Sequence, residues 1–119
     1  MRVMVIGASA NPEKFGHKAV VAYMRQGNEV FPVNPHAEQI AGLHVYRDVR
    51  SVPGPIDRAT VYLPPDLGLE MLDDLAERDD VSELWLNPGA ESEEVIARAR
   101  ELGFEPIVAC SIVAIGEHP

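Results

Sequence analysis

The chain has 119 residues, of which 46% are hydrophobic, and a formal net charge of -9. These values predict one folded domain over residues 1–119 and exclude a two-domain enzyme or a disordered chain. The acidic balance argues against binding to a nucleic-acid backbone, which needs a basic face. No apolar run is long enough to span a membrane, and the chain turns polar after Ile6, too early for a signal peptide. We therefore expect a cytoplasmic protein.

The distribution of charge and the positions of cysteine and histidine limit the classes of ligand that the protein is expected to bind. Residues 1–50 carry a charge of +2, whereas residues 51–119 carry -11, so an anionic ligand is expected at the N-terminal half. The single cysteine, Cys110, excludes an intramolecular disulfide and a CxxC metal site. The four histidines show no paired ligand spacing, and no metal site is predicted.

Apolar runs separated by turn residues predict alternating strands and helices. Strands are expected at residues 2–6, 29–33, 59–63, 84–87 and 106–109, with a shorter one at 43–46. Helices are expected at residues 16–26, 68–75 and 93–102. Pro32 lacks an N–H and has to lie near the end of its strand or on an unpaired side. Ser92 is predicted to cap the last of these helices, because its hydroxyl can accept a bond from a free N–H of the first turn.

This alternation predicts a fold of the α/β class. Parallel strands need crossover connections, so five strands separated in this way indicate a single Rossmann-like domain, a doubly wound parallel sheet of about five strands with helices on both faces. We predict the order 3-2-1-4-5 for the five main strands. The carboxyl ends of parallel strands share one edge, so the loops after the strands are expected to form a pocket there.

The loop at residues 7–16 is the most informative of these loops. It is small and polar and leads to a helix N-terminus, whose free N–H groups favour a phosphate, with Lys14, His17 and Lys18 nearby. An ordinary tight turn with solvated lysines is the alternative. Ser9 and Pro12 occupy later glycine positions of the G-x-G-x-x-G fingerprint, so a nicotinamide site is the less favoured interpretation.

Other catalytic patterns are weak. No serine lies in a G-x-S-x-G motif, and no P-loop follows the first strand. Asn34 stands near the end of the second strand, where a site for NAD usually carries an acidic residue. Cys110, at the end of the last strand, is either a small buried residue or a thiol at the pocket edge that can exchange with a thiol ligand.

Several motifs in order resemble one known family. They are GASANPEKFGHKAV (7–20), GNEVFPVNP (27–35), GLHVY (42–46), VYLPP (61–65), WLNPGAESEEV (85–95) and ELGFEPIVACSIV (101–113). The sequence resembles the small stand-alone CoA-binding domain proteins, which are related to the CoA-binding domain of the succinyl-CoA synthetase alpha subunit. The chain has Leu63 and Ala109 where many members of that family have arginines. The second domain and the active-site histidine of the synthetase are absent.

The resemblance implies a coenzyme A site at the carboxyl edge of the sheet. Its first loop would cradle phosphate, and the turns at 33–35 and 64–65 would line the adenosine end. Two further residues are included among the predicted binding residues because of their positions. His17 lies beside the first loop, and Cys110 follows the last strand. The predicted binding residues are Gly7, Ala8, Ser9, Asn11, Pro12, Lys14, His17, Val33, Asn34, Pro35, Pro64, Pro65, Asn87, Pro88, Gly89 and Cys110.

We therefore expect a domain that binds coenzyme A or an acyl-CoA through the loop between its first strand and first helix, without catalysis. The alternatives are an NAD(P)-binding protein, a thiol-redox protein that depends on Cys110, and a regulatory module whose acidic half docks on a partner protein. Neither nucleic acid nor a membrane is an expected partner. A homo-oligomer is left open.

Overall fold

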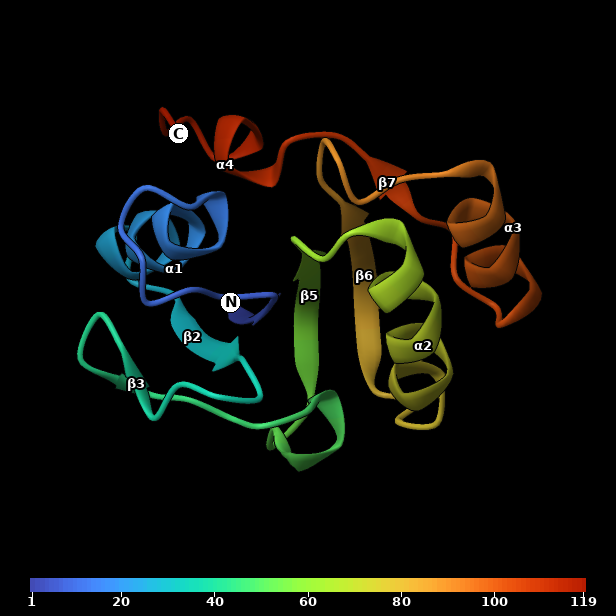
Figure 1. The fold of residues 1–119 in the computed structure, drawn as a ribbon, viewed down its shortest axis with the longest axis horizontal. Helices are drawn as coiled ribbons and strands as arrows, with labels where there is room; N and C mark the ends of the chain where they lie inside the picture. Colours follow the sequence, from blue (N-terminus) through green and yellow to red (C-terminus); the bar gives the residue numbers. More distant parts are fainter.

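A computed structural model describes residues 1–119, and its elements alternate along the chain (Figure 1). The strands are β1 (Arg2–Ile6), β2 (Glu29–Val33), β3 (Gln39–Ile40), β4 (Leu43–His44), β5 (Ile56–Val61), β6 (Val81–Leu86) and β7 (Ile107–Val108). The helices are α1 (Phe15–Arg25), α2 (Pro65–Ala76), α3 (Glu93–Glu101) and α4 (Ser111–Ala114), with a 3-10 turn, η1 (Val49–Ser51). The predicted α/β class is confirmed.

Five parallel strands form the central sheet in the order β2-β1-β5-β6-β7, and β3 and β4 form a separate antiparallel pair. The predicted order 3-2-1-4-5 is wrong, because the third main strand, β5, pairs with β1 and not with β2. The position beside β2 is occupied by Tyr46, whose N–H donates to the carbonyl of Pro32 at 2.9 Å. The nitrogen of Pro32, which carries no hydrogen to donate, thus faces the side of β2 away from β1, as predicted.

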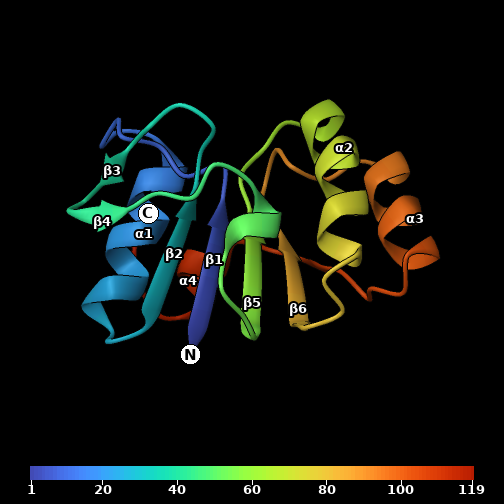
Figure 2. The same ribbon diagram turned by 90° about the horizontal axis from the view of Figure 1, so that it is seen from below.

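An apolar layer packs on each face of the sheet. Figure 2 shows the η1 turn in front of the strands and α4 behind them. On one face α1, α4 and the β3-β4 hairpin pack against Val3 and Val5 of β1. On the other face η1, α2 and α3 pack against Met4 and Ile6 of the same strand. Successive side chains of a strand point to opposite faces, so β1, an interior strand between β2 and β5, supplies both layers.

The crossover between β2 and β5 explains the strand order. Val49 and Val52, in and beside η1, pack on the face opposite α1. Parallel crossovers are right-handed, so a connection on this face returns the chain to the side of β1 away from β2. A connection on the face of α1 would have placed the third strand beside β2.

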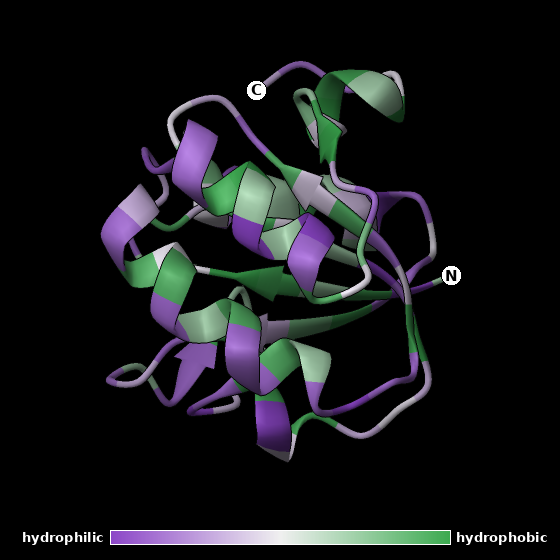
Figure 3. Ribbon diagram, turned by 90° about the vertical axis from the view of Figure 1, so that its right-hand side faces the viewer, coloured by the Kyte–Doolittle hydropathy of each residue, from purple (hydrophilic) through white to green (hydrophobic).

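The start of α3 follows the predicted capping chemistry. The Ser92 hydroxyl accepts the Val95 N–H at 3.1 Å, which confirms it as the cap of α3. Figure 3 shows hydrophilic and hydrophobic residues alternating along α2 and α3, and the buried ones are Met71, Leu72 and Leu75 in α2 and Val95 and Ala99 in α3. No helix has the length and apolar character that crossing a bilayer requires.

Several strand boundaries differ from the predictions. The third strand runs from Ile56 to Val61 and not over 59–63, and the fourth runs from Val81 to Leu86 and not over 84–87. The last strand is reduced to Ile107 and Val108, which pair with Trp85 and Leu86 at the sheet edge. The four residues of α4 were not predicted, because so short a helix has no readable periodicity.

Candidate functional site

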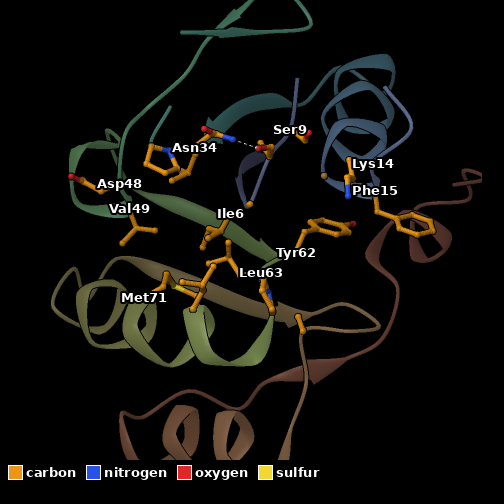
Figure 4. Close-up of a pocket in the computed structure, with 18 of the residues that line it drawn as sticks. Ile6, Ser9, Lys14, Phe15, Asn34, Asp48, Val49, Tyr62, Leu63 and Met71 are labelled. Atoms are coloured by element: carbon orange, nitrogen blue, oxygen red, sulfur yellow. Dashed lines mark hydrogen bonds between the residues drawn. The ribbon is translucent and has the colours of Figure 1, made fainter. Parts of the chain in front are cut away.

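A cleft of about 750 Å³ opens at the carboxyl edge of the sheet, where the loops after β1, β2, β5 and β6 meet (Figure 4). It is elongated. Figure 4 shows Lys14 and Phe15 at one end and Asp48 and Val49 at the other, with Leu63 between them. The cleft thus runs from the start of α1, past the ends of β1 and β2, to η1 and α2.

Two glycines shape the loop between β1 and α1. Gly7 has a φ of +86°, and a Cβ there would lie 2.9 Å from the carbonyl carbon of Tyr62. Gly16, in the first turn of α1, packs against the carbonyl of Gly7 with no space for a Cβ. These two close approaches bring the N-terminus of α1 directly to the end of β1.

The start of α1 is open to an anion. Its N-cap residue, Lys14, makes no side-chain cap, and no acidic residue lies in the first turn. The Lys14 ammonium has no hydrogen-bond or ion-pair partner in the protein, and it lines the cleft. The free N–H groups and partial positive charge of a helix N-terminus favour phosphate.

Hydrogen bonds within the loop between β1 and α1 fix the conformation of its other residues. Nδ1 of His17 donates to the carbonyl of Ser9 at 2.9 Å. The Ser9 hydroxyl accepts the Asn11 N–H at 3.1 Å, and the Asn11 side-chain oxygen accepts the Glu13 N–H at 3.0 Å. Asn11, Pro12 and His17 do not line the cleft. Asn11 and His17 fix the loop by these bonds.

Asn34 connects the first two loops. Its Nδ2 donates to the carbonyl of Ala8 at 2.8 Å, while its Oδ1 accepts the N–H groups of His36 at 2.7 Å and Ala37 at 3.0 Å. An aspartate could accept these bonds but could not donate to Ala8. Asn34 therefore sets the wall of the cleft as well as lining it.

Arg78 stabilises the end of the cleft at η1, although its side chain is not part of the cleft lining. The guanidinium of Arg78 donates to the carbonyls of Val49 at 2.7 Å and Val52 at 2.6 Å and pairs with Asp80 at 2.9 Å. Its side chain is 8% exposed. A buried arginine with four hydrogen bonds fixes η1 and with it the position of Val49 in the cleft wall.

The cleft carries charged side chains of both signs. Its cations are Lys14 and Arg47, and its carboxylates are Asp48, Glu70 and Asp74. Oδ1 of Asp48 accepts the Ser51 N–H at 2.9 Å, and Asp74 pairs with Arg50 at 2.8 Å. Two of the three carboxylates thus have partners within the protein, whereas both cations are free.

Beneath the cleft lies a buried polar network. Asn87, 1% exposed, donates through Nδ2 to the Thr60 hydroxyl at 2.6 Å and to the carbonyl of Val61 at 2.9 Å, and its Oδ1 accepts the Ser111 N–H at 2.8 Å. Burial raises the pKa of Tyr62, which lines the cleft, to about 12, although hydrogen bonds with Ser111 and Thr60 act in the opposite direction. The phenol of Tyr62 is therefore neutral at physiological pH.

The structure brings many of the predicted binding residues together. Those that line the cleft are Gly7, Ala8, Ser9, Lys14, Val33, Asn34, Pro35, Pro64, Pro88 and Gly89. Those outside its lining are Asn11, Pro12, His17, Pro65, Asn87 and Cys110. Asn87 is committed to the buried network, and Cys110, half-buried, precedes α4 and packs beside Tyr62. A role for the Cys110 thiol stays a prediction.

Sequence reasoning missed the other cleft-lining residues. They are Ile6, Phe15, Gly16, Arg47, Asp48, Val49, Tyr62, Leu63, Leu67, Glu70, Met71, Asp74 and Ala90. Four of them could have been predicted from their neighbours in the sequence. Phe15 lies in the predicted first loop, Leu67 follows the Pro64-Pro65 turn, and Tyr62 and Leu63 precede that turn. Residues 47–49 had none, because residues 36–57 are interrupted by Gly42, Pro53, Gly54 and Pro55 and show no clear periodicity.

The fold and the site define a Rossmann-like α/β domain with its cleft at the carboxyl edge. The family model of the CoA binding domain matches residues 1–116, and the chain belongs to this family. A conserved hypothetical protein from Pyrococcus furiosus has the same fold, with a TM-score of 0.86 and 35% identity over 95% of this chain and 97% of that one.

Larger proteins contain a similar domain. The acetate–CoA ligase (ADP-forming) II subunit alpha from Pyrococcus furiosus is 36% identical over 63 residues, which are 52% of this chain and 14% of that protein. The dinucleotide-forming acetyl-coenzyme A synthetase 1 from Ca. Korarchaeum cryptofilum, solved with phosphate and ADP, has a TM-score of 0.71 and 30% identity over 88% of this chain and 25% of that one. The chain thus corresponds to a small part of each of these two proteins.

Proposed function

We propose that the protein binds coenzyme A or an acyl-CoA in the cleft at the carboxyl edge, and that it does so as a binding domain without a reaction of its own. The observation that carries the proposal is the open start of α1 in this cleft, next to the unpaired Lys14. Coenzyme A carries a diphosphate, and this end of the cleft offers helix N–H groups and an ammonium to neutralise it.

The middle of the cleft suits the less polar parts of the ligand. Beyond the diphosphate end, Val33, Val49 and Met71 provide an apolar lining, which favours a nucleobase. Phe15, beside Lys14 at the diphosphate end, and Leu67 of α2 also line the cleft and are 56% and 46% exposed. The pantetheine arm and an acyl group would leave the cleft past them.

The second loop favours coenzyme A over NAD. Asn34 stands where a nicotinamide-dependent protein usually presents a carboxylate to the ribose, and its amide is already used to join the first two loops. Membership of the CoA-binding domain family supports the same ligand.

A thermal-shift titration tests the proposal. The purified protein, freed of carried-over ligand, is titrated with CoA, acetyl-CoA, NAD, NADP and ATP, because a ligand that binds only the folded state raises Tm. We expect CoA and acetyl-CoA to raise Tm at micromolar concentration and the dinucleotides to leave it unchanged. A larger shift with NAD or NADP, or no shift with CoA, would contradict the proposal.

A further inference from the structure

Arg47 differs from every other arginine of the chain in having no hydrogen bond or ion pair within the protein. The other arginine side chains are each paired with a carboxylate: Arg2, Arg25, Arg50, Arg58, Arg78, Arg98 and Arg100. Arg47 is exposed, lines the cleft and also lines a neighbouring hollow beside the β3-β4 hairpin. Its guanidinium is therefore available to a ligand that spans the two.

The backbone holds Arg47 in place on both sides. Tyr46 donates to the carbonyl of Pro32 and accepts the Asn34 N–H, both at 2.9 Å, which fixes the residue before Arg47 against β2. On the other side Asp48 caps η1, and Arg78 binds the carbonyl of Val49 at 2.7 Å. The side chain of Arg47 is free, but it projects from a fixed position in the cleft wall.

Arg47 and Lys14 lie at opposite ends of the cleft. Figure 4 shows Lys14 at one end and Asp48, which follows Arg47, at the other. The carboxylates that share the Arg47 end, Asp48 and Asp74, are bonded to Ser51 and Arg50. The neighbouring hollow adds His36, His44 and one carboxylate, Glu38, which forms no ion pair with Arg47. The cleft thus has two separate positions for anionic groups.

We propose that Arg47 binds a phosphate monoester on the ribose of the ligand, distinct from the diphosphate held at the start of α1. The planar guanidinium donates two parallel N–H bonds to a phosphate, a geometry that an ammonium cannot match. The apolar stretch between the two cations leaves space for the adenosine. This inference rests on the proposed function, because coenzyme A carries such a phosphate and its dephospho form does not. Arg47 is then the residue that discriminates between them.

The test compares CoA with dephospho-CoA by isothermal titration calorimetry at one ionic strength, on the wild type, Arg47→Ala and Arg100→Ala. Arg100 carries the same charge on α3 and does not line the cleft, so its variant controls for net charge. We expect the wild type to bind CoA about 10-fold more tightly than dephospho-CoA, a ratio typical of one charge-assisted contact. In Arg47→Ala the ratio should fall to about 1, through a loss of CoA affinity alone.

The outcomes separate this inference from the proposed function. Equal weakening of both ligands in Arg47→Ala, or a wild type that binds both equally, would overturn the role of Arg47 while leaving CoA binding in place. Failure of the wild type to bind either ligand would overturn both. An Arg47→Lys variant should recover part of the discrimination, since it keeps the charge and loses the planar pair of donors. Unchanged unfolding midpoints would show that the variants fold.

Discussion

The α-carbon of Gly16, in the first turn of α1, packs against the carbonyl oxygen of Gly7, where β1 ends. This contact sets how closely the helix N-terminus approaches the sheet, and with it the position of the proposed diphosphate site. Gly16 thus serves the close packing of helix on strand that the later glycines of a dinucleotide fingerprint provide, although it lies farther along the chain.

Gly16→Ala should destabilise the protein, although alanine is the better helix former. The added methyl group has no space, and such overpacking costs about 1–3 kcal/mol. Gly68→Ala is the matched control in α2, because a Cβ there meets nothing within 4 Å, and it should raise the free energy of unfolding by up to about 1 kcal/mol. Urea denaturation of the two variants checks the opposite signs; a stabilised Gly16→Ala protein would contradict the packing.

Lys14→Glu should weaken CoA binding by about 10-fold or more, because it replaces an unpaired cation of the cleft with an anion at the proposed diphosphate site. Lys18→Glu makes the same charge change one turn farther along α1, where Nζ lies 5.2 Å from the Phe15 ring and outside the cleft lining. Calorimetric titration at fixed salt should show a much smaller loss for Lys18→Glu. Equal losses would indicate a general field effect and not a contact by Lys14.

Asn87→Ala should reduce stability far more than Asn11→Ala. Removing the Asn87 amide leaves the Ser111 N–H without its acceptor in a buried environment, and we expect a loss of about 3 kcal/mol or more. Asn11 is exposed and accepts one backbone N–H, so its loss should cost about 1 kcal/mol or less. Denaturant unfolding measures both. Similar values for the two variants would show that the buried network contributes little.

The raised pKa of Tyr62 predicts a loss of stability at alkaline pH. Tyr62 ionises near pH 10.0 when unfolded and near 12 when folded, so its contribution is complete below pH 10.0 and is lost as the pH rises toward 12. Absorbance titration of the folded protein should show Tyr62 ionising late, as a step that is lost in Tyr62→Phe. The variant should also lose less stability than the wild type between these pH values. An unchanged late step in Tyr62→Phe would assign it to another tyrosine.

The succession of the main strands and helices along the chain and the position of the cleft at one sheet edge can be predicted from the amino-acid sequence. These follow from local causes: the short β-branched runs, the Ser92 cap and the shared edge of parallel carboxyl ends. The first loop, the Asn34 turn and the Pro64-Pro65 turn could be named as cleft walls because each directly follows a strand.

Long-range packing fixes which side of β1 receives the third strand, and it brings residues 47–49 into the wall of the cleft. The strand order depends on the face that the irregular crossover covers, a property of Val49 and Val52 packing across the sheet and not of any local pattern. Nothing in the sequence distinguishes Arg47 from the other arginines. Its distinction, a free guanidinium between two hollows, arises because each of the other arginines pairs with a carboxylate, in most cases one distant along the chain, and none pairs with Arg47.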